Sequence, residues 1–142
     1  MEIITNTTDL CLPVETAAAI GKFDGIHIGH RRLLEEILSR RTQGLAACVF
    51  TFDPPPAYFF GHSDGKELTD KMEKRLLFER MGVDILIEFP LNRETAATPP
   101  VTFAREILGR QMKARFLAAG GDLSFGAGGA GNAELLRRLS PE

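Results

Sequence analysis

Short apolar runs alternate with amphipathic segments along most of this chain. Each run is set off by glycine, proline or charged residues, which is typical of strands buried on both faces of a sheet. The runs predict strands over residues 17–23, 45–52, 83–89 and 115–119. The first of them is rich in alanine, a residue with little intrinsic preference for strands.

Between the predicted strands, apolar residues recur at the spacing of a helix with one buried face. This spacing predicts helices over residues 29–41, 69–81 and 101–112, and a short terminal helix capped by Asn132. The expected buried face of the second helix is Met72, Leu76, Leu77 and Met81, and that of the third is Phe103, Ile107 and Leu108.

Strands that alternate with helices at this spacing indicate an α/β fold, with a parallel sheet flanked by helices on both faces. In such sheets, ligands bind beyond the carboxyl ends of the strands. Polar or glycine-rich segments follow each predicted strand, at residues 21–30, 53–56, 91–98 and 120–131. The sequence therefore predicts a ligand site at this edge of the sheet.

The composition is that of an ordinary globular protein. The 142 residues, 44% of them hydrophobic, suit one domain with a single core. The formal net charge of -2 argues against a nucleic-acid partner bound through a broad basic surface. Cys11 and Cys48 form no C-x-x-C pair, so neither a disulfide framework nor a zinc site is expected. Without a signal peptide or a membrane-spanning apolar run, we expect a cytoplasmic protein with no membrane partner.

Residues 21–30 have the composition of a phosphate-binding turn. They contain three glycines, Asp24, His27 and His30, between the first predicted strand and the first predicted helix. Glycine lets the backbone approach a ligand closely, and a helix N-terminus offers unpaired N–H groups and the positive end of its dipole to an anion. Histidine adds donors whose charge changes near neutral pH. The segment predicts a site for a phosphate chain.

The pattern of this segment, G-x-F-D-G-x-H-x-G-H, resembles that of prokaryotic-type FAD synthetases, whose N-terminal module transfers AMP from ATP to FMN. The H-x-G-H part is similar to the signature of the nucleotidylyltransferase superfamily. The resemblance implies a Rossmann-like (HUP-type) nucleotidylyltransferase fold. The catalytic residues would be His27 and His30, because in the family both contact the ATP phosphates and stabilise the charge that develops during transfer. The implied ATP-binding residues are Gly21, Phe23, Asp24, Gly25, His27, Gly29 and His30.

Two later segments resemble further motifs of the same family. Residues 51–54 read T-F-D-P, and residues 121–126 with the trailing G-N at 131–132 resemble the loop G-x-D-F-x-F-G. In this resemblance Asp53 would orient the flavin phosphate or a metal, Phe125 would offer the isoalloxazine ring a stacking surface, and Asp122 would hold a polar edge. The implied flavin-binding residues are Asp53, Pro54, Asp122, Phe125 and Gly126.

Some positions depart from the family pattern or have simpler explanations. Pro55 stands where the family usually has histidine, and Leu123 and Ser124 replace a phenylalanine and an arginine, so weaker phosphate or flavin binding is expected. Taken alone, Asp-Pro after a strand is a good turn and a glycine-rich stretch is a typical linker. Lys71 and Lys74 match the family's L-T-x-x-x-x-K region, but solvated lysines behind a helix cap explain them equally well.

The sequence stops before the family's I-S-S-T-x-I-R segment, whose serines and arginine complete the ATP site, and before the riboflavin kinase barrel. We therefore expect residues 1–142 to form one FMN adenylyltransferase-like domain, shortened at its C-terminus, with the riboflavin kinase domain absent.

The implied activity is that of an FMN adenylyltransferase, which makes FAD and pyrophosphate from ATP and FMN with Mg²⁺ bridging the phosphates. The metal-binding residues and the oligomeric state stay open. One alternative is a truncated or degenerate relative that binds nucleotide or flavin without catalysis. A weaker alternative is a cytidylyltransferase-like enzyme with another acceptor, against which the F-D-G and S-F-G contexts count.

Overall fold

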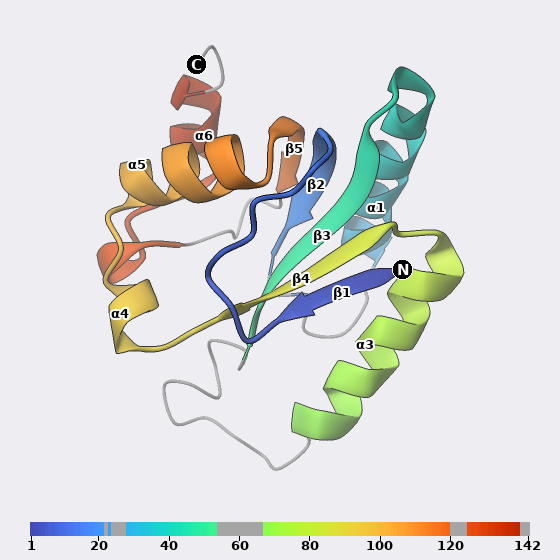
Figure 1. Cartoon of the computed structure of the whole chain (residues 1–142), viewed down its shortest axis with the longest axis horizontal. Helices are drawn as coiled ribbons and strands as arrows, with labels where there is room; N and C mark the ends of the chain where they lie inside the picture. Colours follow the sequence, from blue (N-terminus) through green and yellow to red (C-terminus); the bar gives the residue numbers. More distant parts are fainter. Residues whose placement is uncertain (22, 24–27, 54–66, 120–124, 140–142) are drawn as a thin grey trace.

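The chain folds into a parallel β-sheet between two layers of helices (Figure 1). The computed structural model describes residues 1–21, 23, 28–53, 67–119 and 125–139. Within these residues the sheet has five parallel strands in the order β1-β4-β3-β2-β5, which confirms the predicted α/β class. The strands are β1 (Glu2–Thr5), β2 (Thr16–Ile20), β3 (Ala46–Asp53), β4 (Ile85–Pro90) and β5 (Ala114–Ala119).

The sequence pattern did not predict β1. This strand is four residues long and lies at the edge of the sheet, where Glu2 and Ile3 are exposed. An edge strand of this length carries too few alternating positions to stand out from its surroundings.

The strand order reverses next to β2. From β2 the chain moves through β3 to β4 on one side, and β5 then returns to the other side of β2. Such a reversal leaves a crevice at the carboxyl ends of the two strands that flank it, which is where open α/β sheets bind ligands. In this fold the reversal, and with it the expected ligand position, lies between β2 and β5.

Helices cover both faces of the sheet, as predicted. α1 (Ile28–Ser39), continued by η1 (Arg40–Gln43), lies with α3 (Glu67–Met81) on one face (Figure 1). α5 (Pro100–Thr102), continued by η2 (Phe103–Gln111), lies with α6 (Ala133–Leu139) on the other. Two shorter elements are α4 (Arg93–Ala96) and η3 (Ala127–Gly129).

The alanine-rich strand β2 is buried along its whole length. Ala17 and Ala19 belong to the core beneath α1 and α3, and Ala18 and Ile20 to the core on the opposite face. The one polar side chain of the strand, Thr16, donates its hydroxyl hydrogen to the Met112 carbonyl at 3.0 Å. Burial on both faces favours small side chains here and outweighs the low strand preference of alanine.

The predicted buried face of α3 is wrong in part. Met72 and Leu76 are 55% and 48% exposed, whereas Phe78 is fully buried against the ring of Phe23, with centroids 5.5 Å apart. The helix turns its other side to the sheet because Lys71 and Arg75 reach acidic groups there. The predicted inward positions of the helix over residues 101–112 agree with the structure, since Phe103 and Leu108 are buried and Ile107 is half-buried.

Phenylalanine rings fill the core between the sheet and α5–η2. Phe50 contacts Phe89 at 5.3 Å, and Phe103 contacts Phe125 at 5.2 Å between ring centroids. Phe125 and Gly131 exchange two backbone hydrogen bonds of 3.1 and 2.8 Å, which close the loop between them. A Cβ atom at Gly131 would overlap the Phe125 ring, so this position requires glycine.

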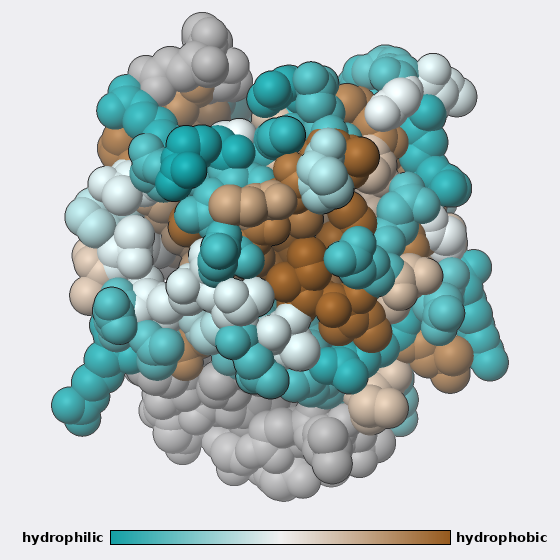
Figure 2. All heavy atoms as spheres, in the orientation of Figure 1, coloured by the Kyte–Doolittle hydropathy of each residue, from teal (hydrophilic) through white to brown (hydrophobic). Residues whose placement is uncertain are grey.

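Figure 2 shows apolar side chains gathered over β1 and β4, surrounded by polar and charged groups. Exposed large apolar side chains elsewhere include Val14 and Val101. In the described part of the chain, every helix is too short or too polar to cross a membrane.

Cysteine reactivity tests the position of β3. Cys48 is fully buried there, and burial raises the pKa of its thiol, whereas Cys11 is exposed. The thiolate is the reactive form, so a buried thiol with a raised pKa reacts very slowly. A hydrogen bond to Asp9 also raises the pKa of Cys11, which slows its reaction without blocking access. Titration with Ellman's reagent should detect Cys11 alone in the native protein and both thiols in guanidinium chloride; fast reaction of both thiols in the native protein would contradict this fold.

The packing of Gly131 under Phe125 is testable by substitution. Gly131→Ala should lower the free energy of unfolding by about 1–3 kcal/mol, because the added methyl group overlaps the buried Phe125 ring, which packs on Phe103. Gly109→Ala is the control: the new methyl group would lie 3.5 Å from the Ala104 carbonyl, and in a helix it should stabilise the protein by roughly 0.5–1 kcal/mol. Urea unfolding followed by circular dichroism measures both, and a Gly131→Ala variant as stable as the wild type would refute the packing.

Candidate functional site

The predicted ligand loops leave the sheet at one edge. β2 ends at Ile20 and β5 ends at Ala119, and these two residues are direct partners in the register. β3 continues beyond this row and ends at Asp53, paired with Pro90 at the end of β4. The expectation that the polar and glycine-rich segments start from a common carboxyl edge is thus confirmed for the strands that lead into them.

α1 begins at the same edge. It packs on β2, β3 and β5, and because it connects the parallel strands β2 and β3 it runs antiparallel to them. Its first turn contains Gly29 and His30, whose backbone is described. Asp24, Gly25 and His27 lie outside the described residues. The helix therefore directs the positive end of its dipole toward the carboxyl edge, next to the G-x-F-D-G-x-H-x-G-H segment.

Phe23 fixes the path of this segment after β2. Its φ of 52° is in the left-handed region, which costs a residue with a side chain about 1–2 kcal/mol. Its ring is fully buried against Phe78, and burial of such a ring contributes about 1.5–3 kcal/mol, enough to offset the strain. Gly21 leads into the turn, and its N–H donates to the Phe50 carbonyl at 3.2 Å. Since the ring belongs to the core, it does not offer a surface for the predicted contact with ATP.

Asp53 is engaged by a lysine of α3. Its Oδ2 atom lies 2.6 Å from Nζ of Lys71, and the two side chains are 27% and 28% exposed. The Asp53 carbonyl also accepts the Leu91 N–H at 3.0 Å, which ties the end of β3 to the chain after β4. Asp53 thus lies where the sequence places it, at the carboxyl edge, but as one half of an ion pair. Pro54 lies outside the described residues.

Behind this pair lies a buried acid that the sequence reasoning missed. Glu88 in β4 is 4% exposed and accepts two hydrogen bonds from Arg75, at 2.9 Å from Nε and 2.5 Å from Nη2. This hydrogen bonding raises the pKa of Arg75. Nζ of Lys71 lies 3.8 Å from Glu88, so the lysine stands between two carboxylates. These side chains form a row with two acids and two bases in balance, namely Asp53, Lys71, Glu88 and Arg75. It runs from the carboxyl edge into the interface between α3 and the sheet.

The sequence carries a signal for this row. Glu88 is a charged residue inside the apolar run 83–89, and a carboxylate is almost never buried unless it is paired. Lys71 and Arg75 are four residues apart and therefore lie on one side of a helix. The combination indicates that α3 turns a basic side toward the sheet.

Phe125 and Gly126 also have structural roles. Phe125 is 4% exposed, and its ring packs on Phe103. Gly126 has a φ of 75°, and a Cβ there would come within 2.9 Å of Pro100. The Ala127 N–H donates to the Thr98 carbonyl at 2.7 Å, which holds the loop on the start of α5. Burial leaves little of the Phe125 ring for the predicted flavin contact, and Asp122 lies outside the described residues.

The described residues do not bring three histidine, cysteine or acidic side chains together as a metal site. Asp53 is the acidic residue at the end of β3, and it is paired with Lys71. This arrangement does not fit a Mg²⁺ site made by protein ligands, since Mg²⁺ prefers several oxygen ligands in octahedral geometry.

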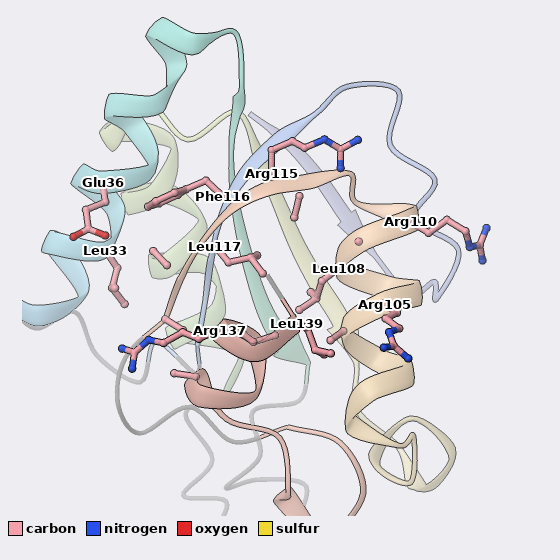
Figure 3. A pocket seen from close by; sticks show the side chains of 17 residues that line it. Leu33, Glu36, Arg105, Leu108, Arg110, Arg115, Phe116, Leu117, Arg137 and Leu139 are labelled. Carbon is pink, nitrogen blue, oxygen red and sulfur yellow. The ribbon is translucent and has the colours of Figure 1, made fainter. Parts of the chain in front are cut away.

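A groove of about 1140 Å³ lies elsewhere, along the outer side of β5 between α1, η2 and α6 (Figure 3). Leu108, Leu117 and Leu139 point into it from three different elements. Arg115 at its rim is paired with Glu15. Ala119, the last residue of β5, is the point where this groove approaches the carboxyl edge, and no predicted site residue within the described ranges lines it.

Comparison with known proteins identifies relatives over most of the chain. The bifunctional riboflavin kinase/FMN adenylyltransferase of Escherichia coli (strain K12) is 34% identical over 125 residues, covering 87% of this chain and 40% of the relative. The FAD synthetase of Listeria monocytogenes is 32% identical over 122 residues, covering 84% of this chain and 49% of the relative. The chain thus spans less than half the length of these two curated relatives.

A solved structure has a similar fold. The crystal structure of a macrolide-efflux protein from Streptococcus pneumoniae superposes with a TM-score of 0.78 at 26% identity, over 96% of this chain and 45% of that one. The model of the FAD synthetase family matches residues 12–142, a range that contains the motif segments 21–30, 51–54 and 121–132. With this match and a five-stranded parallel sheet whose helices cover both faces, the chain belongs to the FAD synthetase family and has its nucleotidylyltransferase fold.

Proposed function

We propose that this chain is an FMN adenylyltransferase, which forms FAD and pyrophosphate from ATP and FMN. The observation that carries the proposal is the pairing of Ile20 with Ala119 at the ends of β2 and β5. From these neighbouring strand ends start the segment with His27 and His30 and the segment with Asp122. A nucleotide site and a flavin site on adjacent loops are what transfer between two phosphate-bearing substrates requires.

In the proposed reaction, a phosphate oxygen of FMN attacks the α-phosphorus of ATP. A new P–O bond forms between the two nucleotides as the bond to pyrophosphate breaks, so no covalent intermediate with the protein is needed. The part of the protein is to position the reactants and stabilise charge on the transferred group. His27, His30 and the first N–H groups of α1 are the proposed donors to the ATP phosphates.

Mg²⁺, when carried by the triphosphate, would neutralise charge on the leaving pyrophosphate. His27, His30 and the backbone N–H groups at the start of α1 would donate hydrogen bonds to the same phosphate oxygens. Asp53, at the end of β3, is proposed to face the flavin phosphate.

A member of the family that binds flavin or nucleotide without catalysis is the second candidate. It is favoured by the burial of the Phe125 ring, which leaves little surface for a flavin, and by the departures at Pro55, Leu123 and Ser124. Under this alternative, FMN or ATP would raise the melting temperature of the protein, but no pyrophosphate would be released at any protein concentration.

Incubation with ATP, FMN and MgCl₂, followed by chromatography of the flavins, tests the proposal. The wild type should form FAD, and His30→Ala should lower the rate by about a hundred-fold or more, because one donor to the transition state is lost. Arg41→Gln is the control. It removes an exposed pair with Asp84 at the opposite, amino edge of the sheet and should leave the rate unchanged. Binding of FMN without any FAD would favour the second candidate, and equal rates for His30→Ala and wild type would remove His30 from the proposed catalytic residues.

A further inference from the structure

Lys71 is held in place from two sides. Its ammonium group lies 2.6 Å from Asp53 and 3.8 Å from Glu88. Glu88 already accepts two hydrogen bonds from Arg75, so the guanidinium group balances the charge of Glu88 without the lysine. The shorter contact, and therefore the stronger attraction, is the one to Asp53. Lys71 is thus chiefly the partner of Asp53, and Glu88 with Arg75 forms the support behind it.

This pairing decides which charge the edge of the sheet presents. Asp53 ends β3 at the carboxyl edge, with 27% of its side chain exposed. An unpaired carboxylate at that position would repel any phosphate that approached the edge. Paired with Lys71, which is also partly exposed, it forms a neutral couple with hydrogen-bond donors on one side. An anionic ligand can therefore approach this pair at a far lower electrostatic cost than it could approach an unpaired carboxylate.

We propose that Lys71 is a positioning residue for the phosphate of the flavin substrate, acting through Asp53, which it neutralises and fixes in orientation. This inference rests on the proposed function. It gives a role to a lysine that the sequence explains equally well as part of a family segment or as a solvated side chain behind a helix cap. The chemical class recognised is a phosphate monoester, so riboflavin, which lacks the phosphate, is the matched neutral probe.

The first test measures binding of FMN and riboflavin by quenching of flavin fluorescence. Lys71→Met should weaken FMN binding by at least about tenfold, because the Asp53 carboxylate is then unpaired. Riboflavin binding should change by less than about twofold, since no charge is involved. Lys71→Arg keeps the positive charge and should stay within about threefold of the wild type for FMN. In the FAD assay, Lys71→Met should raise KM for FMN more than it lowers kcat.

The second test separates charge from structure with a double-mutant cycle. If Lys71 acts by neutralising Asp53, its loss should matter only while residue 53 carries a charge. The Lys71→Met substitution should therefore weaken FMN binding much less in an Asp53→Asn background than in the wild type. A lysine that merely stabilised the helix would give equal effects in both backgrounds.

Controls keep the outcomes distinct. Arg41→Met is the control for the loss of a different ion pair. It removes the 3.0 Å pair between Arg41 and Asp84 at the amino edge of the sheet, and should leave FMN binding unchanged. Circular dichroism confirms folding, and Lys71→Gln replaces Lys71→Met if the latter is unfolded. Wild-type affinity for FMN in the folded Lys71 variant, or equal losses for FMN and riboflavin, would overturn the role of Lys71 alone. A wild-type protein that neither binds FMN nor forms FAD would overturn the proposed function and this inference with it.

Discussion

The parallel pairing of strands that are buried on both faces is the constraint on which the rest of this structure depends. Because β2, β3, β4 and β5 all run in one direction, their carboxyl ends meet at one edge. Helices on both faces then leave that edge as the place from which the segments after the strands start. Burial of the β2 side chains on both faces explains why this strand is built from alanine.

The charged row from Asp53 to Arg75 is the exception to this apolar construction, and it sets the rotation of α3. Two basic side chains occupy the stripe that faces the sheet, and Met72 and Leu76 face outward instead. A buried carboxylate such as Glu88 is tolerated because Arg75 meets it with two hydrogen bonds. Such rows contribute little net stability compared with apolar packing, so their use at the end of β3 points to a local requirement for fixed charge.

The aromatic residues of the two family motifs serve as anchors rather than as open contacts. Phe23 is buried in the core beneath α1 and α3, and Phe125 in the core on the opposite face of the sheet. Each motif is therefore attached to the fold through one buried ring. A glycine lies close by in each case: Gly21 next to the Phe23 ring, and Gly126 against Pro100. Anchoring of this kind fixes where the polar residues of a loop begin, which is what a preorganised ligand site needs.

The sequence by itself determined the alternation of strands and helices, the parallel α/β class, the family and the edge of the sheet from which its motif segments start. These features follow from local periodicity and from contiguous motifs such as residues 21–30, which can be recognised without knowledge of distant contacts. Asn132 is an example: its side chain accepts the Leu135 N–H at 2.9 Å, as its position before an amphipathic segment predicts. Only the tertiary structure decided that β1 joins the edge of the sheet, that Phe23 and Phe125 belong to the core, and that Lys71 pairs with Asp53. Each of these depends on contacts between residues far apart in the chain, and their energies outweigh the local pattern.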